Sequence, residues 1–255
     1  MISNKSNMSL PLQIFMVHSE YDLVKGDDYI SATSLLKPIK STILSGRIKG
    51  STMDTLDLVA SAVGTASHDR LEKAFTGKLL PSSMRKLGFP ESLISKIIIN
   101  PKGVEPEDIP IYLEKRSIKA LNNWRIGGKF DFVMEGIVRD LKTTKVFKWM
   151  KGDFEDYVLQ GSIYRWLNQD IITEDYMYID FIFTDWKAYE YESKEGYPKY
   201  PALSKAMDLM SIEETEAWLS GRLALLESYA DAEQGDIPNC TSHELWMDDP
   251  KYAYY

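Results

Sequence analysis

The sequence predicts an α/β protein in which a small mixed sheet is flanked by helices. Apolar residues recur at helical spacing in residues 53–75 and again at about 211–233, which predicts two amphipathic helices. Three β-prone segments follow one another between residues 111 and 144. A helix expected at 154–169 separates them from a fourth β-prone segment at 176–183. The order of helix, three strands, helix, strand and helix is typical of an α/β architecture.

The helix expected at 53–75 shows the clearest periodicity in the chain. Its repeating positions are Leu56, Val59, Ala60, Val63, Ser67, Leu71 and Phe75. Before it, the stretch DDYISATSLLKP predicts another helix start, with Ser31, Thr33 or Ser34 as the N-cap and Pro38 as the stop. Among the strands, WRIGGKFDFVM and IVRDLKTT are joined tightly through Glu135 and Gly136, which predicts a hairpin.

Length and composition indicate one domain spanning residues 1–255. Its core is expected at about 54–184, with an N-terminal elaboration at 1–53 and a C-terminal helical extension at 185–255. With 44% hydrophobic and 27% charged residues, the chain can bury a proper core. No apolar run approaches the roughly 18 residues of a membrane span, and the first residues lack the pattern of a secretory signal. We therefore expect a cytoplasmic protein that makes no contact with a membrane.

Two counts limit the chemistry further. Cys240 is the only cysteine, which excludes intrachain disulfides and any all-cysteine metal site within one chain. The formal net charge of −8 argues against a protein that coats nucleic acid through bulk charge. It still allows an enzyme that holds nucleic acid in a local basic groove, because the local field decides such binding.

An acid and a lysine stand two positions apart in the third expected strand, as Asp140 and Lys142 in IVRDLKTTK. Side chains alternate between the faces of a strand, so these two share one face. Asp131, in the preceding strand, falls near Asp140 if the two strands form an antiparallel hairpin. Two converging carboxylates repel unless a cation lies between them, and Mg²⁺ takes oxygen ligands from carboxylates, water and phosphate. A cross-strand charge cluster, in which Lys142 compensates the acids, is the alternative, and these three residues do not decide between the two.

Two of the expected helices carry further polar side chains of interest. Gln160 and Tyr164 are four residues apart, which places them on one face of their helix. His68 lies on the inward flank of the helix at 53–75, and Gly64, one turn earlier, leaves open space beside the imidazole. The alternatives are a structural histidine and a glutamine partly buried among core tyrosines.

Taken in order, these motifs resemble those of the PD-(D/E)xK nuclease superfamily. Gly128 and Asp131 in GGKFDF match its Gly-x-x-Asp motif, and DLK, residues 140–142, matches its Asp-x-Lys motif. Two further elements resemble the RecB-like exonuclease branch in its phage-type form: Gly-x-x-x-His in GTASHDRLE and Gln-x-x-x-Tyr in QGSIY. The resemblance covers residues 64–164 through the motifs, and extends to about 183 through the order of the elements.

The resemblance implies a restriction-endonuclease-like core, built as helix, three strands, helix and strand, and a metal-dependent site. It implies Mg²⁺ or Mn²⁺ as the cofactor, and no iron–sulfur cluster, because the subgroup that holds one needs four cysteines. The implied ligands are His68, Asp131, Asp140 and the backbone carbonyl of Leu141. Glu114, on the first core strand, is a further candidate, although an exposed strand glutamate explains it as well. The implied catalytic residues are Asp131, Asp140, Lys142, Gln160 and Tyr164, with Lys142 positioning a water or stabilising developing charge.

Three segments lie outside the motifs. In TTKVFKWMKGD, cations and a ring are placed to meet phosphates and bases of DNA, unless the segment is a solvated loop with anchoring aromatics: Lys145, Lys148, Trp149 and Lys151. The long connection at 76–110, punctuated by Pro and Gly, predicts a short helix near 90–98 and a role as a lid or DNA-guiding element. The tail IPNCTSHELWMDDPKYAYY resembles a C-terminal pattern of phage-type members.

The function that the resemblance implies is a DNA exonuclease that hydrolyses phosphodiester bonds in recombination, replication or repair. Such a protein would be encoded by a phage and act in the host cytoplasm. Its partner would be DNA, together with a recombination or single-strand-binding protein, and it could form an oligomer. A structure-specific or restriction-type endonuclease is one alternative, and it would cut closed circles that an exonuclease spares. A DNA-binding module that kept the fold without catalysis is the other.

Overall fold

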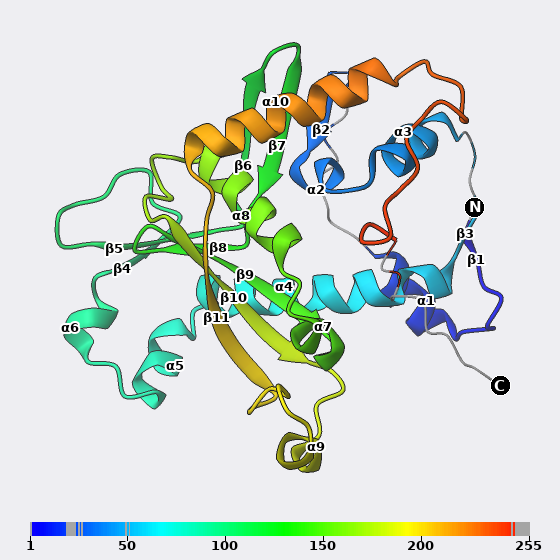
Figure 1. Ribbon diagram of the computed structural model, residues 1–255. Coiled ribbons are helices and arrows are strands. Elements are labelled where there is room, and N and C mark those ends of the chain that lie inside the picture. The colour runs from blue at the N-terminus through cyan, green and yellow to red at the C-terminus, as the bar shows by residue number, and fades with distance from the viewer. Residues whose placement is uncertain are drawn as a thin grey trace.

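A computed structural model of the chain describes residues 2–18, 24, 26, 28–48, 50, 52–245 and 247. It confirms the α/β class, with mixed sheets flanked by helices (Figure 1). The helices are α1 (Leu10–Val17), α2 (Ala32–Leu35), α3 (Ile39–Arg47), α4 (Val59–Thr76), α5 (Leu80–Lys86), α6 (Glu91–Ile94), α7 (Val146–Lys151), α8 (Glu155–Leu167), α9 (Ala188–Ser193) and α10 (Ile212–Ser228). The strands are β1 (Ile2–Ser3), β2 (Tyr29–Ser31), β3 (Met53–Asp54), β4 (Ile97–Ile99), β5 (Ile109–Leu113), β6 (Arg116–Leu121), β7 (Trp124–Lys129), β8 (Phe132–Met134), β9 (Ile137–Thr144), β10 (Tyr176–Phe183) and β11 (Ala202–Asp208).

The largest sheet has the strand order β11-β10-β9-β8-β5-β4. Its centre is antiparallel from β5 through β8 to β9, whereas β10 runs parallel to β9. The elements α4, β5, β8, β9, α8 and β10 therefore follow the expected order of helix, three strands, helix and strand. Two smaller sheets accompany it, with the orders β1-β3 and β2-β7-β6.

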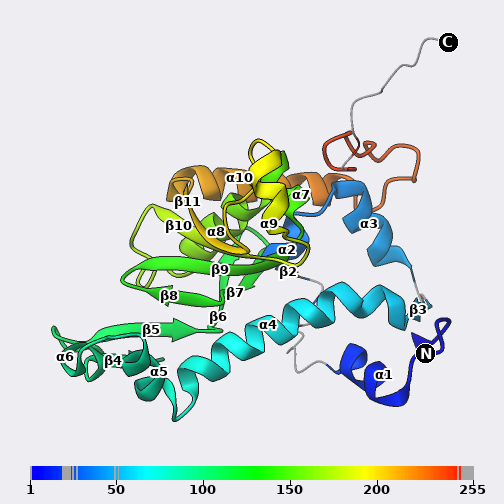
Figure 2. The ribbon, with the colours of Figure 1, turned by 90° about the horizontal axis from the view of Figure 1, so that it is seen from below.

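Helices cover both faces of the large sheet, as Figure 2 shows with α4 on one face and α8 and α10 on the other. Strand β9 contacts both α4 and α8, and is the centre of this arrangement. The largest apolar cluster lies between the sheets, α8 and α10, and its fully buried members include Ile126, Phe130, Ile163, Trp166, Ile179, Phe181, Leu219 and Leu223. Burial of this apolar surface is the main favourable contribution to folding.

Two of the expected strands are divided between two sheets. The segment at 111–120 continues as β5 only to Leu113, because Glu114 adopts a left-handed backbone conformation with φ of 51° and redirects the chain into β6. The segment at 124–134 likewise leaves β7 after Lys129 and enters the large sheet as β8. A run of alternating residues predicts a strand but not which sheet each half joins.

The hairpin between β8 and β9 turns through Glu135 and Gly136, as expected. Both residues have positive φ, 54° and 76°, which is the conformation of a type I′ turn. The pairing of Phe132 with Arg139 and of Met134 with Ile137 fixes the register. This register brings Asp131, the residue before β8, level with Asp140 in β9.

Elsewhere the structure corrects several expectations. The helix start expected in DDYISATSLLKP is confirmed as α2, with Ser31 as its N-cap, but α2 ends at Leu35, before Pro38, and a short strand, β2, precedes it. The helix expected at 53–75 begins as a 3-10 turn at Thr55–Leu58 and becomes α4. In the segment at 76–110 the short helix expected near 90–98 is confirmed as α6, and the segment also holds α5 and β4, which pairs with β5. The segment at 185–255, expected to be helical, also contributes β11, which pairs antiparallel with β10.

The expected C-terminal pattern at 237–255 falls partly outside the described residues, at 246 and 248–255. Among the helices that the structure does describe, none combines the length and apolar character that a membrane crossing requires. The division of the chain into a core and two elaborations stays a prediction.

Asp54 fastens the N-terminal segment to the start of α4. Its carboxylate accepts hydrogen bonds from the Ser3 hydroxyl at 2.6 Å, the Lys5 amide at 3.0 Å and the Leu56 amide at 3.1 Å. These bonds, led by that from Ser3, hold the pKa of Asp54 below its ordinary value of 3.8.

We expect Asp54→Asn to lower the melting temperature at neutral pH, because Asn cannot accept these bonds as strongly. A carboxylate whose pKa is lowered by folding stabilises the protein above its unfolded-state pKa, and this contribution disappears as the pH falls through the folded-state pKa. Thermal melts of both proteins from pH 7 down to pH 3 should therefore converge at the acidic end. A difference that is constant across that range would contradict this assignment.

Candidate active site

Three potential metal ligands from distant parts of the sequence meet at one point. His68 comes from the middle of α4, Glu114 from the turn between β5 and β6, and Asp131 from the residue before β8. One ligand atom of each lies within 4.8 Å of the others. Imidazole and carboxylate groups at this spacing are the donors that divalent ions use in proteins.

Asp131 is the best-connected residue of this cluster. One carboxylate oxygen lies 3.1 Å from Nδ1 of His68 and accepts the backbone N–H of Leu141, also at 3.1 Å. Burial alone would raise the pKa of Asp131, but His68, Lys142 and the Leu141 amide together hold it below the ordinary value. The hydrogen bond between His68 and the Asp131 carboxylate raises the pKa of His68.

Asp140 is nearly inaccessible, with its side chain 3% exposed. Burial, with a smaller contribution from the Asp131 carboxylate, raises its pKa to about 6, although Lys142 acts in the opposite direction. Its Oδ2 lies 2.5 Å from Nζ of Lys142, but no hydrogen bond of good geometry to a described residue satisfies this buried oxygen. A buried carboxylate oxygen that is incompletely satisfied is costly unless a further cation can reach it.

Lys142 connects Asp140 to helix α8. Its ammonium donates to Oε1 of Gln160 at 3.2 Å, and Nε2 of Gln160 donates to the Tyr164 hydroxyl at 2.8 Å. The ring of Tyr157 lies one turn before Gln160, and its centroid is 5.3 Å from the Lys142 ammonium. Burial alone would lower the pKa of Lys142, but Asp140 and Asp131 raise it. The lysine is therefore held as an ammonium between two carboxylates and an amide.

Gly128 explains how Tyr164 comes so close to β7. A Cβ at this position would lie 2.9 Å from Cε1 of the Tyr164 ring and 2.9 Å from Cδ1 of Leu167. The hydrogen atom of glycine leaves the room that the ring needs. The glycine of the Gly-x-x-Asp motif thus acts through helix α8, by letting Tyr164 and Gln160 sit against the strand.

Glu114 has a partner that sequence reasoning missed. The ammonium of Lys129 forms an ion pair with the Glu114 carboxylate, and burial raises the pKa of Glu114. The backbone amide of Glu114 donates to the Asp131 carbonyl at 3.1 Å. The strained φ of Glu114 therefore serves to bring its side chain beside Asp131, as such conformations often do at functional sites. The signal was the position of Lys129, two residues before Asp131 on the same face.

The residues expected to contact DNA after β9 lie on and around α7. Lys145 is exposed at the start of this helix, whereas Lys148 is buried and lies 5.1 Å from the centroid of the Tyr157 ring. Trp149 is half-buried, with ring contacts to Phe154, Phe181 and Phe183. Lys151 lies 3.9 Å from Asp153. This arrangement favours the aromatic anchor that the alternative interpretation describes, with Lys145 and Lys151 as the exposed cations of the group.

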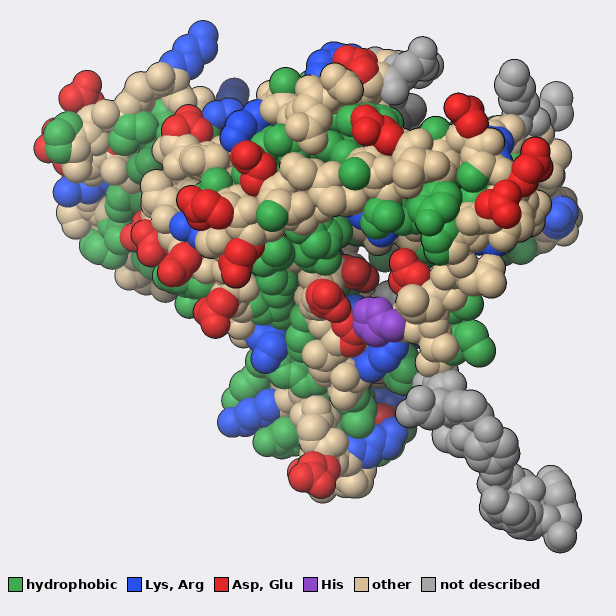
Figure 3. Space-filling model, turned by 45° about the horizontal axis from the view of Figure 1, so that its top comes forward, with side chains coloured by type: hydrophobic (Ala, Val, Ile, Leu, Met, Phe, Trp, Pro, Cys, Tyr) green, Lys and Arg blue, Asp and Glu red, His purple; other side chains and the backbone are tan. Residues whose placement is uncertain are grey.

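His243 lies 2.9 Å from Asp153 through Nε2 and does not belong to the group formed by His68, Glu114 and Asp131. Acidic and basic side chains are interspersed over the face shown in Figure 3, so the net charge of −8 does not form a uniform coat there.

The residues present fit a divalent cation. The donor set of one imidazole and two carboxylates suits Mg²⁺ or Mn²⁺, and the buried Oδ2 of Asp140 offers a further acceptor nearby. Asp140 does not belong to the group of atoms within 4.8 Å, and its carboxylate pairs with Lys142. Its role as a ligand, and that of the Leu141 carbonyl, stay predictions.

Comparison with solved structures bears on the fold. The chain is similar to a protein described as SSO0001, with 14% identity, 85% of each chain covered and a TM-score of 0.52. Two weaker likenesses are to a protein from Eubacterium rectale that is provisionally described as an exonuclease (13% identity, 91% of this chain and 97% of that chain, TM-score 0.43) and to a phage-related exonuclease from Haemophilus somnus 129PT (16% identity, 83% and 95%, TM-score 0.34). At 14% identity, the likeness to SSO0001 shows a shared fold alone. The TM-scores of the other two are too low to support an argument about the fold. No protein-family model and no curated protein sequence matches the chain.

The contact between Gly128 and Tyr164 gives a stability prediction. We expect Gly128→Ala to lower the free energy of unfolding by about 1–3 kcal/mol, because the methyl group overpacks the interface between β7 and α8. Gly64→Ala is the matched control, since a Cβ there meets no atom within 4 Å and alanine favours the helix by roughly 0.5–1 kcal/mol. Urea unfolding of both variants checks this, and equal effects would contradict the steric role of Gly128.

Proposed function

We propose that this protein is a metal-dependent deoxyribonuclease that hydrolyses DNA phosphodiester bonds. The observation that carries the proposal is the convergence of His68, Glu114 and Asp131 beside the chain of contacts from Asp140 through Lys142 and Gln160 to Tyr164. Possible metal ligands on one side and a held ammonium on the other are the parts that phosphodiester hydrolysis needs. A surface charge cluster would not require the buried orientation of these groups.

In this proposal His68, Asp131 and Asp140 hold Mg²⁺ or Mn²⁺, with Glu114 and the Leu141 carbonyl as further ligands. A divalent ion at this position supplies Lewis-acid chemistry, by lowering the pKa of water and neutralising charge on a phosphate. His68 is fixed for this purpose by Asp131, and Asp131 is fixed by the Leu141 amide.

Lys142 has a positioning and electrostatic role in the proposal. Its ammonium is held by Asp140 and Gln160, so the position and direction of its N–H donors are fixed. A phosphate oxygen or an attacking water beside the carboxylates would meet that ammonium first. Gln160 keeps its Oε1 toward Lys142 because its Nε2 is occupied by Tyr164. Charge that develops on the phosphate would thus be stabilised by a group already in place.

Within this class we propose a RecB-like exonuclease of phage type that acts in recombination, replication or repair. The order and spacing of the Gly-x-x-x-His, Gly-x-x-Asp, Asp-x-Lys and Gln-x-x-x-Tyr motifs support it, as does the way in which the fold brings them to one place. The proposal includes a single nuclease domain, DNA as the substrate, and a recombination or single-strand-binding protein as a partner.

The proposal is tested by measuring degradation of a linear DNA and a closed circle with Mg²⁺ in the wild type and in two variants. Asp140→Asn and Lys142→Ala should each reduce degradation of the linear DNA by about 10²-fold or more, because each removes a group that acts on the transition state. EDTA should abolish the wild-type activity, and the circle should survive.

Matched controls are Glu195→Ala and Lys199→Ala, which remove the same charges from exposed positions in the connection between α9 and β11. Both should degrade DNA at the wild-type rate. Undiminished activity in Asp140→Asn and Lys142→Ala, with folding verified by circular dichroism, would refute the proposed site. Cleavage that persists in EDTA would refute its dependence on metal.

A further inference from the structure

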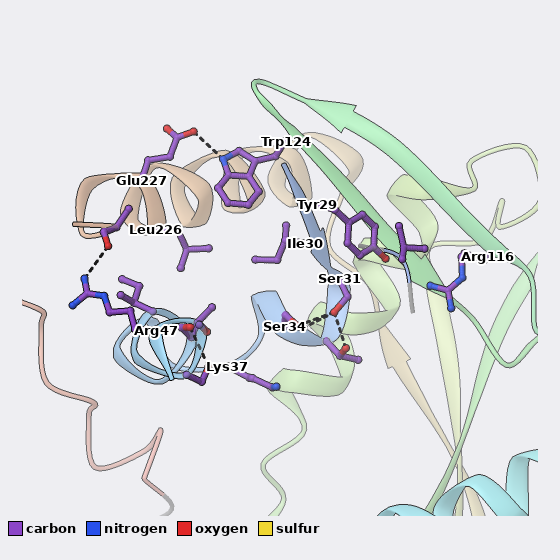
Figure 4. A pocket seen from close by; sticks show the side chains of 17 residues that line it. Tyr29, Ile30, Ser31, Ser34, Lys37, Arg47, Arg116, Trp124, Leu226 and Glu227 are labelled. Atoms are coloured by element: carbon purple, nitrogen blue, oxygen red, sulfur yellow. Dashed lines mark hydrogen bonds between the residues drawn. The ribbon is translucent and has the colours of Figure 1, made fainter. Parts of the chain in front are cut away.

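A cavity of about 880 Å³ lies outside the metal cluster, between α2, α3, the β2-β7-β6 sheet and the end of α10. Figure 4 shows Trp124 and Glu227 at one end, Arg116 at the other, and Ser31, Ser34 and Lys37 between them. A volume of this size belongs to small-molecule sites and accommodates a few unpaired nucleotides, but no duplex.

The charged residues of this cavity are unusual for a chain of net charge −8. Among the residues that the structure describes, three cations line it, Lys37, Arg47 and Arg116, against one acid, Glu227. Glu227 is engaged, because its carboxylate accepts the indole N–H of Trp124 at 2.8 Å. The exposed ammonium of Lys37 has no hydrogen bond or ion pair to any residue that the structure describes. The cavity therefore favours an anionic ligand.

Arg47 and Arg222 hold the cavity walls together. The guanidinium of Arg47 donates to the carbonyls of Ala230 and Ala232, each at 2.8 Å, just after α10. Arg222 of α10 donates to the carbonyl of Leu35 at 2.9 Å and to that of Lys37. The backbone of Lys37 is thus fixed by α10, whereas its side chain is left to face a ligand.

The remaining lining suits bases and sugars. The half-buried rings of Tyr29 and Trp124 offer flat apolar surfaces, and Ile30, Ile43 and Leu226 form an apolar wall. Gly127 permits the approach of Tyr29, since a Cβ there would lie 2.3 Å from the tyrosine oxygen. Rings for stacking and cations for phosphates are the combination that binds single-stranded nucleic acid.

Arg116 connects the cavity with the metal cluster. It follows Glu114 by two residues, and in the β6–β7 pairing it lies opposite Lys129, whose ammonium pairs with Glu114. Two residues of extended chain span at most about 7 Å, so the Arg116 end of the cavity lies beside the backbone of Glu114.

We propose that this cavity binds the single-stranded end of the DNA substrate, with Lys37 and Arg116 on phosphates and with Trp124 and Tyr29 against bases. The assignment rests on the proposed nuclease function. In this proposal the cavity selects an unpaired DNA end for hydrolysis at the metal cluster.

The test measures binding of a fluorescein-labelled ten-residue oligothymidylate by anisotropy in EDTA, so that no cleavage occurs. Lys37→Glu should weaken binding on the order of ten-fold in low salt, and should flatten the slope of log Kd against log salt by roughly 0.7. Lys199→Glu, which changes the net charge equally at an exposed position between α9 and β11, should leave the affinity unchanged. Equal Kd values for Lys37→Glu and Lys199→Glu would overturn the proposal.

Two further arms identify what the cavity holds. Trp124→Leu should weaken binding about five-fold or more, whereas Trp124→Phe keeps a ring and should retain most of the affinity. Thymidine monophosphate should compete weakly against the oligothymidylate, because a strand makes several contacts. Competition by the mononucleotide at equal concentration would overturn the strand assignment in favour of a nucleotide site, and equal affinities of Trp124→Leu and the wild type would remove the stacking contact.

Failure of this proposal is distinguishable from failure of the proposed function. With Mg²⁺ and linear DNA, Lys37→Glu should raise KM and keep kcat, since it is remote from the reacting atoms. If Lys37→Glu binds and cleaves like the wild type while Asp140→Asn is inactive, the nuclease stands and the cavity proposal falls. If all variants fail to cleave but Lys37→Glu alone loses binding, the cavity proposal stands as a DNA site without the nuclease.

Discussion

Two carboxylates that approach each other away from water, Asp131 and Asp140, are the constraint on which the rest of the structure depends. The register of the β8–β9 hairpin brings them level, and their repulsion contributes to a raised pKa for Asp140. Neighbouring groups compensate the two negative charges: His68 and the Leu141 amide bind Asp131, and Lys142 pairs with Asp140. The compensation is incomplete, because the buried Oδ2 of Asp140 lacks a well-placed hydrogen-bond donor among the described residues. A divalent ion would complete it.

The fold supplies these compensating groups through a few local devices. Positive φ values at Glu135 and Gly136 close the hairpin in the register that aligns the acids. A second positive φ, at Glu114, turns the chain from one sheet into another and leaves that carboxylate beside Asp131. Gly128 admits the ring of Tyr164, and helix α8 can then present Gln160 to Lys142. Each of these features is a backbone conformation or a missing side chain, and each one positions a charged side chain of the site.

Much of this could be predicted from the sequence, because period-two and helical patterns place residues on faces. Asp131, Asp140 and Lys142 were expected to share one side of a hairpin, and Gln160 and Tyr164 one side of a helix. The sequence could not show where a strand changes sheet, because Glu114 carries no local signal of its backbone conformation. For the same reason the pairing of Lys129 with Glu114 was missed. The cavity lined by Tyr29, Lys37 and Trp124 depends on segments far apart in sequence, which the pairing of β2 with β7 and the packing of α10 against α3 bring together.

We propose that the metal site carries out hydrolysis and that the cavity beside it binds the unpaired end of the DNA. The claim on which the nuclease function depends is that the acidic cluster binds a divalent cation. Calorimetric titration of the DNA-free protein with Mn²⁺ tests it most directly. The account predicts one site in the wild type and in Asp180→Asn, whose carboxylate pairs with Arg139 elsewhere in the sheet, and at least about ten-fold weaker binding in Asp131→Asn. Equal Mn²⁺ binding by all three proteins, or none by the wild type, would contradict it.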